Sequence, residues 1–347
     1  ICKQILNNRI KKPELLDCTI RDGGYLNNWN FTDQEVLDCY KTVSKCNFDY
    51  FEIGFRSNDK LLPGKGKWCY SQEDDINHLA SQFKGTKICV MAKMGTVNID
   101  DFIEKRLSNV DLIRVLVPRC NIINSEKISE YSEKDLIDAR EFSIQLINLG
   151  YEVCINLGCG DLITDRELNL IIKHFHDLKI KSLYLADTYG GFNSKNIPKV
   201  IHRFYSELDK YDSEISLGFH IHNNNGDGLN KAQTAIFHGC TMIDSSLGGL
   251  GRGSGNLKTE ELVCGELAHT DVNFKERITA VVEYYDTYIL SKEKNNLQKI
   301  KLHHPLYNIA GVLSLHPDYI LELLENLDNT ITEDIDMIFK LNEYTIQ

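Results

Sequence analysis

The sequence lacks any run of about 18 apolar residues, the shortest stretch that spans a membrane as a helix. It also lacks an excess of basic residues, since 39 Lys and Arg stand against 50 Asp and Glu, giving a formal net charge of −11. Binding to nucleic-acid phosphates needs the opposite balance, because Lys and Arg displace their counterions. These two absences argue against a membrane protein and against a nucleic-acid partner.

Paired cysteines are absent as well. The 11 cysteines are scattered from Cys2 to Cys264, and no two have the C-x-x-C spacing of redox and zinc sites. An odd, scattered set in a long chain is typical of free thiols rather than of a disulfide framework. The first 25 residues contain Lys11, Lys12 and Asp17 but no apolar core of a signal peptide. We therefore expect a cytoplasmic protein with reduced thiols.

Short apolar runs alternate with amphipathic segments along most of the chain. The runs lack a strict apolar–polar alternation, which is typical of parallel strands buried on both faces. The predicted strands are Leu15–Ile20, Tyr50–Gly54, Lys87–Met91, Leu112–Val117, Glu152–Leu157, Ser182–Ala186, Ile215–Ile221 and Thr241–Ser245. The helices predicted between them are Asp33–Lys45, Glu73–Phe83, Glu133–Leu149, Asp165–Leu178, Ile197–Leu208 and Asp227–His238.

Eight strands that alternate with helices predict an α/β fold, namely a (β/α)8 TIM barrel. A doubly wound open sheet is the main alternative, but the turn after the first strand lacks the G-x-G-x-x-G pattern usual there. After residue 270 the alternation stops, and Phe274–Leu290 and Pro317–Leu327 are predicted helices. We expect a barrel domain over residues 14–268 and a helical C-terminal segment over residues 269–347, packed against or beside the barrel mouth.

Two histidines at the predicted mouth of the barrel indicate a metal site. Catalytic side chains of TIM barrels lie at the C-terminal ends of the strands. His220 and His222 lie two residues apart in the seventh predicted strand, so both project from one face. The first strand ends in Arg21 and Asp22, and barrel closure brings it near the seventh. We expect Asp22, His220 and His222 to bind one divalent ion and to leave coordination positions open, as a catalytic site requires.

The predicted ligands are nitrogen and oxygen atoms without a thiolate. Such a set suits Mn²⁺ or Mg²⁺, which we expect first, and also Co²⁺ or Zn²⁺. The eighth predicted strand leads into a loop with five glycines between residues 248 and 255. This loop is open to three interpretations, namely a phosphate-binding loop, a loop without a ligand, or a loop that turns Asn256 inward as a further metal or substrate contact.

Three motifs together resemble the DRE-TIM metallolyase superfamily. They are Asp17-Cys18-Thr19-Ile20-Arg21-Asp22-Gly23, His220-Ile221-His222 and Gly249-Leu250-Gly251-Arg252-Gly253-Ser254-Gly255-Asn256. The resemblance covers about residues 14 to 268, and its motifs lie on the first, seventh and eighth predicted strands. The superfamily includes HMG-CoA lyases, isopropylmalate and homocitrate synthases, and 4-hydroxy-2-oxovalerate aldolases. Within it the chain is most similar to the aldolases.

The resemblance implies a role for each matching residue. It makes Asp22, His220 and His222 metal ligands, Arg21 the stabiliser of an enolate, and Asn256 a further contact. It also implies substrate-binding residues on three other strands, which are Glu52 ending the second strand, Arg114 within the fourth and Asp187 ending the sixth.

One position departs from the aldolase pattern. The aldolases have a catalytic His four residues after the matching Arg, whereas this chain has Tyr25. The lyases and synthases have Gln or Glu in that region, and residues 24–26 of this chain contain neither. We therefore expect the general base to be Tyr25 itself, or a residue of the C-terminal segment, namely Tyr307, His303 or His304.

The expected activity is that of a class II-type, metal-dependent aldolase, a carbon–carbon lyase. It would cleave a 4-hydroxy-2-oxo acid, or form one, through a pyruvate enolate and an aldehyde. The alternatives are an acyl-CoA-dependent condensing enzyme on the same scaffold and a non-catalytic barrel that binds a metal or another ligand. The resemblance also implies an aldehyde dehydrogenase as a partner, and the fold class commonly forms homodimers.

Overall fold

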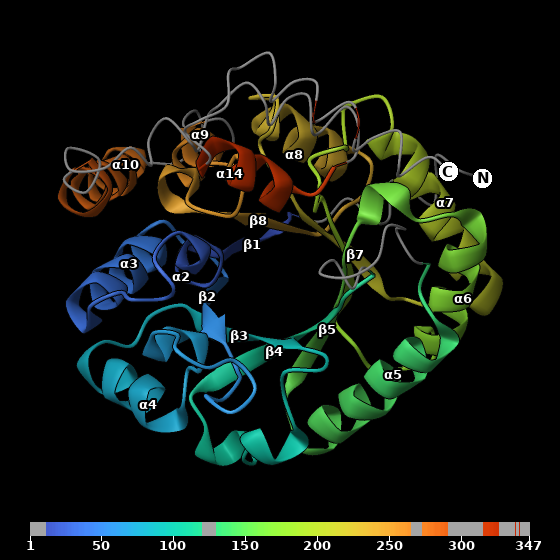
Figure 1. The fold of residues 1–347 in the computed structure, drawn as a ribbon, viewed down its shortest axis with the longest axis horizontal. Coiled ribbons are helices and arrows are strands. Elements are labelled where there is room, and N and C mark those ends of the chain that lie inside the picture. The colour runs from blue at the N-terminus through green and yellow to red at the C-terminus, as the bar shows by residue number, and fades with distance from the viewer. Residues whose placement is uncertain are drawn as a thin grey trace.

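The computed structural model describes residues 12–119, 130–264, 273–290 and 315–325, together with positions 337 and 340. Within these ranges eight parallel strands follow one another in chain order, and β8 pairs with β1 to close a barrel (Figure 1). The strands are β1 (Glu14–Asp17), β2 (Tyr50–Phe55), β3 (Lys87–Lys93), β4 (Val110–Val117), β5 (Glu152–Leu157), β6 (Ser182–Ala186), β7 (Ser216–His220) and β8 (Met242–Ser245). The predicted (β/α)8 barrel is confirmed.

Helices surround the barrel on the outside, as Figure 1 shows. The long ones are α3 (Asp33–Lys45), α4 (Glu73–Gln82), α5 (Glu133–Asn148), α6 (Asp165–Phe175), α7 (Ile197–Leu208) and α8 (Gly228–Phe237). Each agrees with its predicted helix to within three residues at either end. The Thr32 side chain accepts a hydrogen bond from the Glu35 amide, and Thr164 and Glu167 form a capping box, so two of these starts are set by local sequence.

Short helical turns connect the strands to the long helices. They are α2 (Thr19–Gly23), η1 (Gly24–Leu26), η2 (Lys67–Cys69), η3 (Ile99–Asp101), η4 (Lys105–Leu107), η5 (Gly160–Leu162), η6 (Asp209–Tyr211), η7 (Leu247–Gly249) and α9 (Thr259–Leu262). Of these turns, α2 and η1, which follow β1, contribute residues to the cavity described below.

Two predicted strands end earlier than expected. The first ends at Asp17 rather than Ile20. The Asp17 carboxylate accepts hydrogen bonds from the Thr19 amide at 2.9 Å and from the Thr19 hydroxyl at 2.8 Å, and these bonds turn the chain into α2. The seventh ends at His220, and His222 forms an isolated bridge with Asn256 instead. The motif residues Arg21, Asp22 and His222 therefore lie just beyond the strands.

The interior of the barrel is filled with side chains. Seven strands contribute one residue each to a buried apolar cluster, and Cys18 joins them; its members are Leu16, Cys18, Tyr50, Cys89, Leu112, Cys154, Tyr184 and Met242. Such a layer is typical of TIM barrels and leaves space for a ligand only at the ends of the strands. The nine cysteines that the structure describes are all free, as expected.

The C-terminal part is helical where it is described. It forms α10 (Phe274–Tyr284), the π-helix η9 (Tyr285–Leu290) and α14 (Pro317–Glu325). The α10 helix packs against α3, and the hydroxyl of Tyr288 donates to the carboxylate of Asp38 at 2.6 Å, so this helix joins the outer layer of the barrel. The division at residue 268 stays a prediction. No helix in the described ranges is long and apolar enough to cross a membrane.

Candidate active site

A cavity of about 130 Å³ opens at the C-terminal ends of the strands. Its lining includes residues from all three sequence motifs, namely Arg21, Asp22, His220, His222 and Arg252, and also Tyr25. Asp22 and Arg252 are separated by 230 residues along the chain, and barrel closure between β8 and β1 brings them together. The cavity is therefore the candidate active site.

The three predicted metal ligands lie within reach of one ion. One ligand atom from each of Asp22, His220 and His222 falls within 4.8 Å of the others, and all three residues are buried. The two imidazole rings stand nearly perpendicular, with centroids 5.1 Å apart. Nε2 of His220 lies 3.8 Å from a carboxylate oxygen of Asp22. This geometry fits two histidines and a carboxylate that share one divalent cation.

The surroundings of these side chains favour the protonation states that a metal requires. Burial raises the pKa of Asp22, but the charges of Arg21, His220 and His222 outweigh it and hold the pKa well below its usual value. Burial and the neighbouring His220 lower the pKa of His222 to about 3. At neutral pH Asp22 is therefore ionised and His222 is neutral, so each has a lone pair for a cation.

Asn256 supplies a further oxygen beside Asp22. Its side-chain N–H donates to the Asp22 carboxylate at 2.7 Å, whereas its buried Oδ1 has no hydrogen-bond partner among the described residues. A buried, unpaired oxygen of this kind calls for a ligand. A Cβ at Gly251 would lie 2.7 Å from the Asp22 carboxylate and 2.4 Å from the Asn256 nitrogen, so the glycine permits this close approach. The four side chains together fit a divalent ion.

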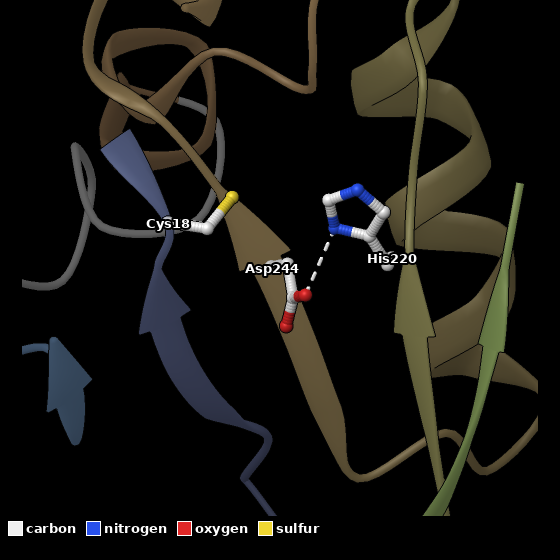
Figure 2. Close-up of side chains that lie close together, drawn as sticks. All are labelled: Cys18, His220 and Asp244. Carbon is white, nitrogen blue, oxygen red and sulfur yellow. Dashed lines mark hydrogen bonds and ion pairs between the residues drawn. The ribbon is translucent and has the colours of Figure 1, made fainter. Parts of the chain in front are cut away.

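A second group of candidate ligands lies just below the first. Figure 2 shows Cys18, which follows β1 directly, with His220 from β7 and Asp244 from β8. Nδ1 of His220 is hydrogen-bonded to the Asp244 carboxylate at 2.9 Å. Burial raises the pKa of Cys18 well above its usual value, and its thiol donates to the carbonyl of Ser245. Since no thiolate is available, Asp244 is better placed to orient His220, whose other nitrogen is directed to Asp22.

Glu52 and Arg114 lie beneath the cavity and belong to one buried ion network. The Arg21 guanidinium donates to Glu52 at 2.7 Å, and Arg114 contacts Glu52 at 3.0 Å and Asp244 at 2.6 Å. Both Glu52 and Arg114 are fully buried, and neither lines the cavity. Glu52 lies in the middle of β2 rather than at its end. The contacts that the structure shows for these residues are with protein groups, so their predicted contact with substrate stays a prediction.

Asp187 follows β6 directly and lies behind His222. Its carboxylate accepts from the ammonium of Lys231 at 3.1 Å and from the amide of Phe192 at 3.0 Å. The same ammonium donates to the backbone carbonyl of His222 at 3.0 Å. Asp187 and the fully buried Lys231 thereby anchor the loop that carries the candidate metal ligand His222, and the predicted role of Asp187 in substrate binding stays a prediction. No sequence motif indicated Lys231.

Tyr25 lines the cavity at the position where the aldolases have a histidine. Its ring packs edge-on against Trp29 and Phe55, and the Arg252 guanidinium lies 5.4 Å from the ring centre. Partial burial raises the pKa of Tyr25, so its hydroxyl stays protonated at neutral pH. The other predicted bases, Tyr307, His303 and His304, lie outside the described residues.

The start of α14 lies beside the cavity mouth. Arg252, which lines the cavity, donates to the Asp318 carboxylate at 3.0 Å. His316 is buried next to this pair, where its Nδ1 accepts the amide N–H of Asp318 and its ring packs edge-on against Tyr189. Sequence analysis did not single out His316 or Asp318, because contact between residues 66 positions apart depends on the tertiary structure.

Comparison with curated proteins identifies several relatives. The chain is 25% identical over 268 residues to oxaloacetate decarboxylase of Mycobacterium tuberculosis, covering 76% of this chain and 74% of that protein. It is 24% identical over 257 residues to 4-hydroxy-2-oxovalerate aldolase of Carboxydothermus hydrogenoformans, covering 73% and 70%. It is 23% identical over 284 residues to 2-isopropylmalate synthase of Buchnera aphidicola, covering 81% of this chain and 52% of that protein, about half its length.

Solved structures share the fold. The N-terminal domain of a candidate aldolase from Bacteroides vulgatus superposes with a TM-score of 0.72 at 24% identity, covering 92% of this chain and 99% of that chain. HMG-CoA lyase from Bacillus subtilis superposes with a TM-score of 0.61 at 19% identity, covering 80% and 93%. The model of the HMGL-like family matches residues 12–284, a range that contains the strands, the three motifs and the cavity. The chain therefore belongs to the HMGL-like family.

Proposed function

We propose that the protein is a metal-dependent aldolase that cleaves or forms a carbon–carbon bond of a 4-hydroxy-2-oxo acid. Pyruvate and an aldehyde are the products of cleavage and the substrates of the reverse reaction. The observation that carries this proposal is the meeting of Asp22, His220 and His222 with Arg21 at one cavity. Two relatives in the family have names that contain a 2-oxo acid, the oxaloacetate decarboxylase and the 4-hydroxy-2-oxovalerate aldolase.

Asp22, His220 and His222 would hold the ion, and Asn256 would add its free oxygen. A bound Mn²⁺ or Mg²⁺ ion would supply Lewis-acid polarisation of the oxygens of the 2-oxo acid. The family's divalent-metal chemistry and the donor atoms present both support this assignment, with Co²⁺ and Zn²⁺ as alternatives.

Arg21 is placed to stabilise negative charge at the enolate oxygen. Glu52 and Asp22 hold its Nε and Nη1, whereas Nη2 has no acceptor among the described residues. Because the guanidinium is buried and always charged, it is a preorganised donor that needs no rearrangement when the charge develops.

Tyr25 fits the role of proton donor. Its raised pKa keeps the hydroxyl protonated, and it lines the same cavity as Arg21. After cleavage, the Tyr25 hydroxyl would protonate the carbon of the pyruvate enolate. Removal of the proton from the 4-hydroxyl group requires a base, and Tyr307, His303 and His304 remain the predicted candidates for it.

The test is pyruvate release from 4-hydroxy-2-oxopentanoate, followed with a coupled lactate dehydrogenase. Metal removal with a chelator should lower the rate at least 100-fold, and addition of Mn²⁺ or Mg²⁺ should restore it. Undiminished cleavage after complete metal removal would contradict the proposed mechanism.

A condensing enzyme that uses acyl-CoA is the second candidate, because several relatives are 2-isopropylmalate synthases. Release of free thiol from acetyl-CoA in the presence of a 2-oxo acid, without pyruvate release in the first assay, would favour it. Calorimetric binding of metal and pyruvate, with no turnover in either assay, would favour a non-catalytic barrel.

A cytoplasmic location belongs to the same proposal. Eight of the nine cysteines that the structure describes are buried as free thiols, and Cys264 is exposed. Free thiols in this number persist in a reducing compartment. Fractionation of cells and immunodetection of the protein would test the location.

A further inference from the structure

Among the residues that the structure describes, four Lys and Arg side chains line the cavity, and one of them differs from the rest. Three are neutralised by carboxylates, in the pairs Arg21 with Asp22 and Glu52, Arg119 with Glu167, and Arg252 with Asp318. The fourth is Lys93, whose ammonium has no hydrogen bond and no carboxylate within ion-pair distance in the part of the chain that the structure describes. The nearest acidic group that acts on it is Asp318, which is itself paired with Arg252.

The position of Lys93 follows from strand geometry. It is the last residue of β3, two residues beyond Met91, which also lines the cavity, and four beyond Cys89, which lies in the interior cluster. Alternate residues of a strand point to one face, so this face of β3 leads from the barrel interior to the cavity. Lys93 is half-buried. Partial removal of an unpaired ammonium from water is costly, and an anion in the cavity would offset that cost.

Lys93 lies across the mouth from two of the three candidate metal ligands, the histidines. In the closed order of eight strands, β3 is four strands from β7, so Lys93 and the two histidines lie on opposite sides of the barrel. A 2-oxo acid whose carboxylate and keto group lie at Arg21 and at an ion held by Asp22 and the histidines would extend its other end towards β3. The cavity therefore has a positive charge where the aldehyde half of the substrate would lie.

We propose that Lys93 binds an anionic group, a carboxylate or a phosphate, on the aldehyde half of the substrate. The enzyme would then prefer 4-hydroxy-2-oxo acids that split into pyruvate and a negatively charged aldehyde. This inference rests on the proposed function for the orientation of the substrate, but the anion-binding step itself can be measured without turnover.

Lysine chemistry offers a second role, which the same variants test. Burial and the nearby charge of Arg252 lower the pKa of Lys93, and a lysine with a lowered pKa is also a candidate general base or Schiff-base nucleophile. Arginine keeps the positive charge and does not lose its proton. A Lys93→Arg variant therefore retains anion binding but not proton transfer.

The first experiment measures binding to the metal-loaded protein by calorimetry. The ligands are 2-oxoglutarate and 2-oxopentanoate, which have the same five-carbon chain, differ in their distal carboxylate, and lack the 4-hydroxyl group needed for cleavage. We expect the wild type to bind 2-oxoglutarate about 10- to 100-fold more tightly, the range for a hydrogen-bonded charge pair. Lys93→Met should remove this difference and Lys93→Arg should retain most of it.

Lys87→Met is the matched control. Lys87 lies at the opposite end of the same strand and pairs with Glu152 at 3.3 Å, far from the cavity lining. This substitution removes an equal charge and should leave the binding ratio unchanged. Equal binding of both ligands by the wild type, or a ratio that Lys93→Met does not alter, would overturn the proposal.

The second experiment compares cleavage of 4-hydroxy-2-oxoglutarate with that of 4-hydroxy-2-oxopentanoate. A higher kcat/KM for the first substrate that disappears in Lys93→Met and persists in Lys93→Arg supports anion recognition. Loss of all cleavage in Lys93→Arg would instead assign a base or nucleophile and overturn it. A binding preference without cleavage of either compound would leave the anion site in place and refute the aldolase assignment.

A third experiment, which follows carbon–carbon bond formation, distinguishes a carboxylate from a phosphate as the bound anion. Pyruvate is supplied with glyoxylate or acetaldehyde in one pair of reactions, and with glyceraldehyde 3-phosphate or glyceraldehyde in the other. A Lys93-dependent preference within the first pair identifies a carboxylate, and one within the second pair identifies a phosphate. The absence of a preference in both pairs would contradict the proposal.

Discussion

The two ends of the barrel hold charged side chains in opposite ways. At the N-terminal end, Lys87 pairs with Glu152 and Lys181 pairs with Glu14 at 3.3 and 2.8 Å, and these side chains are between 25 and 51% exposed. Just beneath the cavity at the C-terminal end, Arg21 and Arg114 pair with Glu52 and Asp244, and no side chain in these pairs is more than 6% exposed.

The difference indicates which charged side chains support the chemistry of the cavity. Exposed pairs contribute about 0–1 kcal/mol to stability and are readily replaced. Buried pairs carry a desolvation cost that apolar residues of the same volume would avoid. The buried charges near the C-terminal end therefore carry a cost in folding free energy, and we interpret them as the support of a reactive site.

Replacement of Asp22 by Asn should have the largest effect. It removes a negative charge from the ligand set while keeping the shape of the side chain, so metal affinity and cleavage should each fall by a factor of about 1,000 or more. Equilibrium dialysis with Mn²⁺ and the pyruvate assay measure the two losses. Circular dichroism serves as the folding control, and a variant that keeps both metal and activity would remove Asp22 from the site.

Replacement of Arg21 by Lys should lower kcat by about 100- to 1,000-fold, because an ammonium cannot reproduce the fixed donors of the guanidinium. Metal affinity should change much less, since Arg21 is not a ligand. Steady-state kinetics at saturating Mn²⁺ would show the split. A fall in metal affinity as large as that in kcat would mean that Arg21 acts through the ion.

Asp161 links the C-terminal end to pH. Burial and the nearby charge of Asp187 raise its pKa to about 7, against about 4 in the unfolded chain. A raised folded-state pKa stabilises the protein below pH 4, and this contribution is lost as the pH rises to 7. Between pH 5 and pH 8 the wild type should lose about 2–3 kcal/mol of unfolding free energy relative to Asp161→Asn. Parallel pH profiles from urea titrations would refute this.

Replacement of Asp244 by Asn should weaken metal binding by about 10- to 100-fold. The carboxylate accepts from His220 and so orients a metal ligand without touching the ion. A purely structural role would lower the melting temperature and leave the affinity of the folded protein unchanged. Mn²⁺ titration of the folded variant separates these two outcomes.

Lys87→Met at the N-terminal end should have the smallest effect. Its ammonium is half-exposed, so loss of the Glu152 pair should change the unfolding free energy by no more than about 0.5 kcal/mol and leave kcat unaltered. Chemical denaturation and the pyruvate assay provide both numbers. A large loss of activity would contradict the view that only the charges near the C-terminal end support catalysis.

The sequence predicted the eight strands and six long helices because their signals are local. Strand ends were less accurate, as at Asp17, where a side chain that accepts two hydrogen bonds from Thr19 ends β1 early. The proximity of Asp22, His220 and His222 was also predictable, because the topology of a closed barrel places the first and seventh strands near each other, whereas their role as metal ligands stays a prediction.

What the sequence alone determined was thus the barrel, its three motifs and the residue types that can hold a cation. The tertiary structure decided the partners of those residues. Asp244 behind His220, Lys231 behind His222 and Lys93 across the cavity carry no motif, since their importance arises from neighbours far away in the chain. Burial then sets the protonation state of each group, and burial depends on the folded environment as a whole.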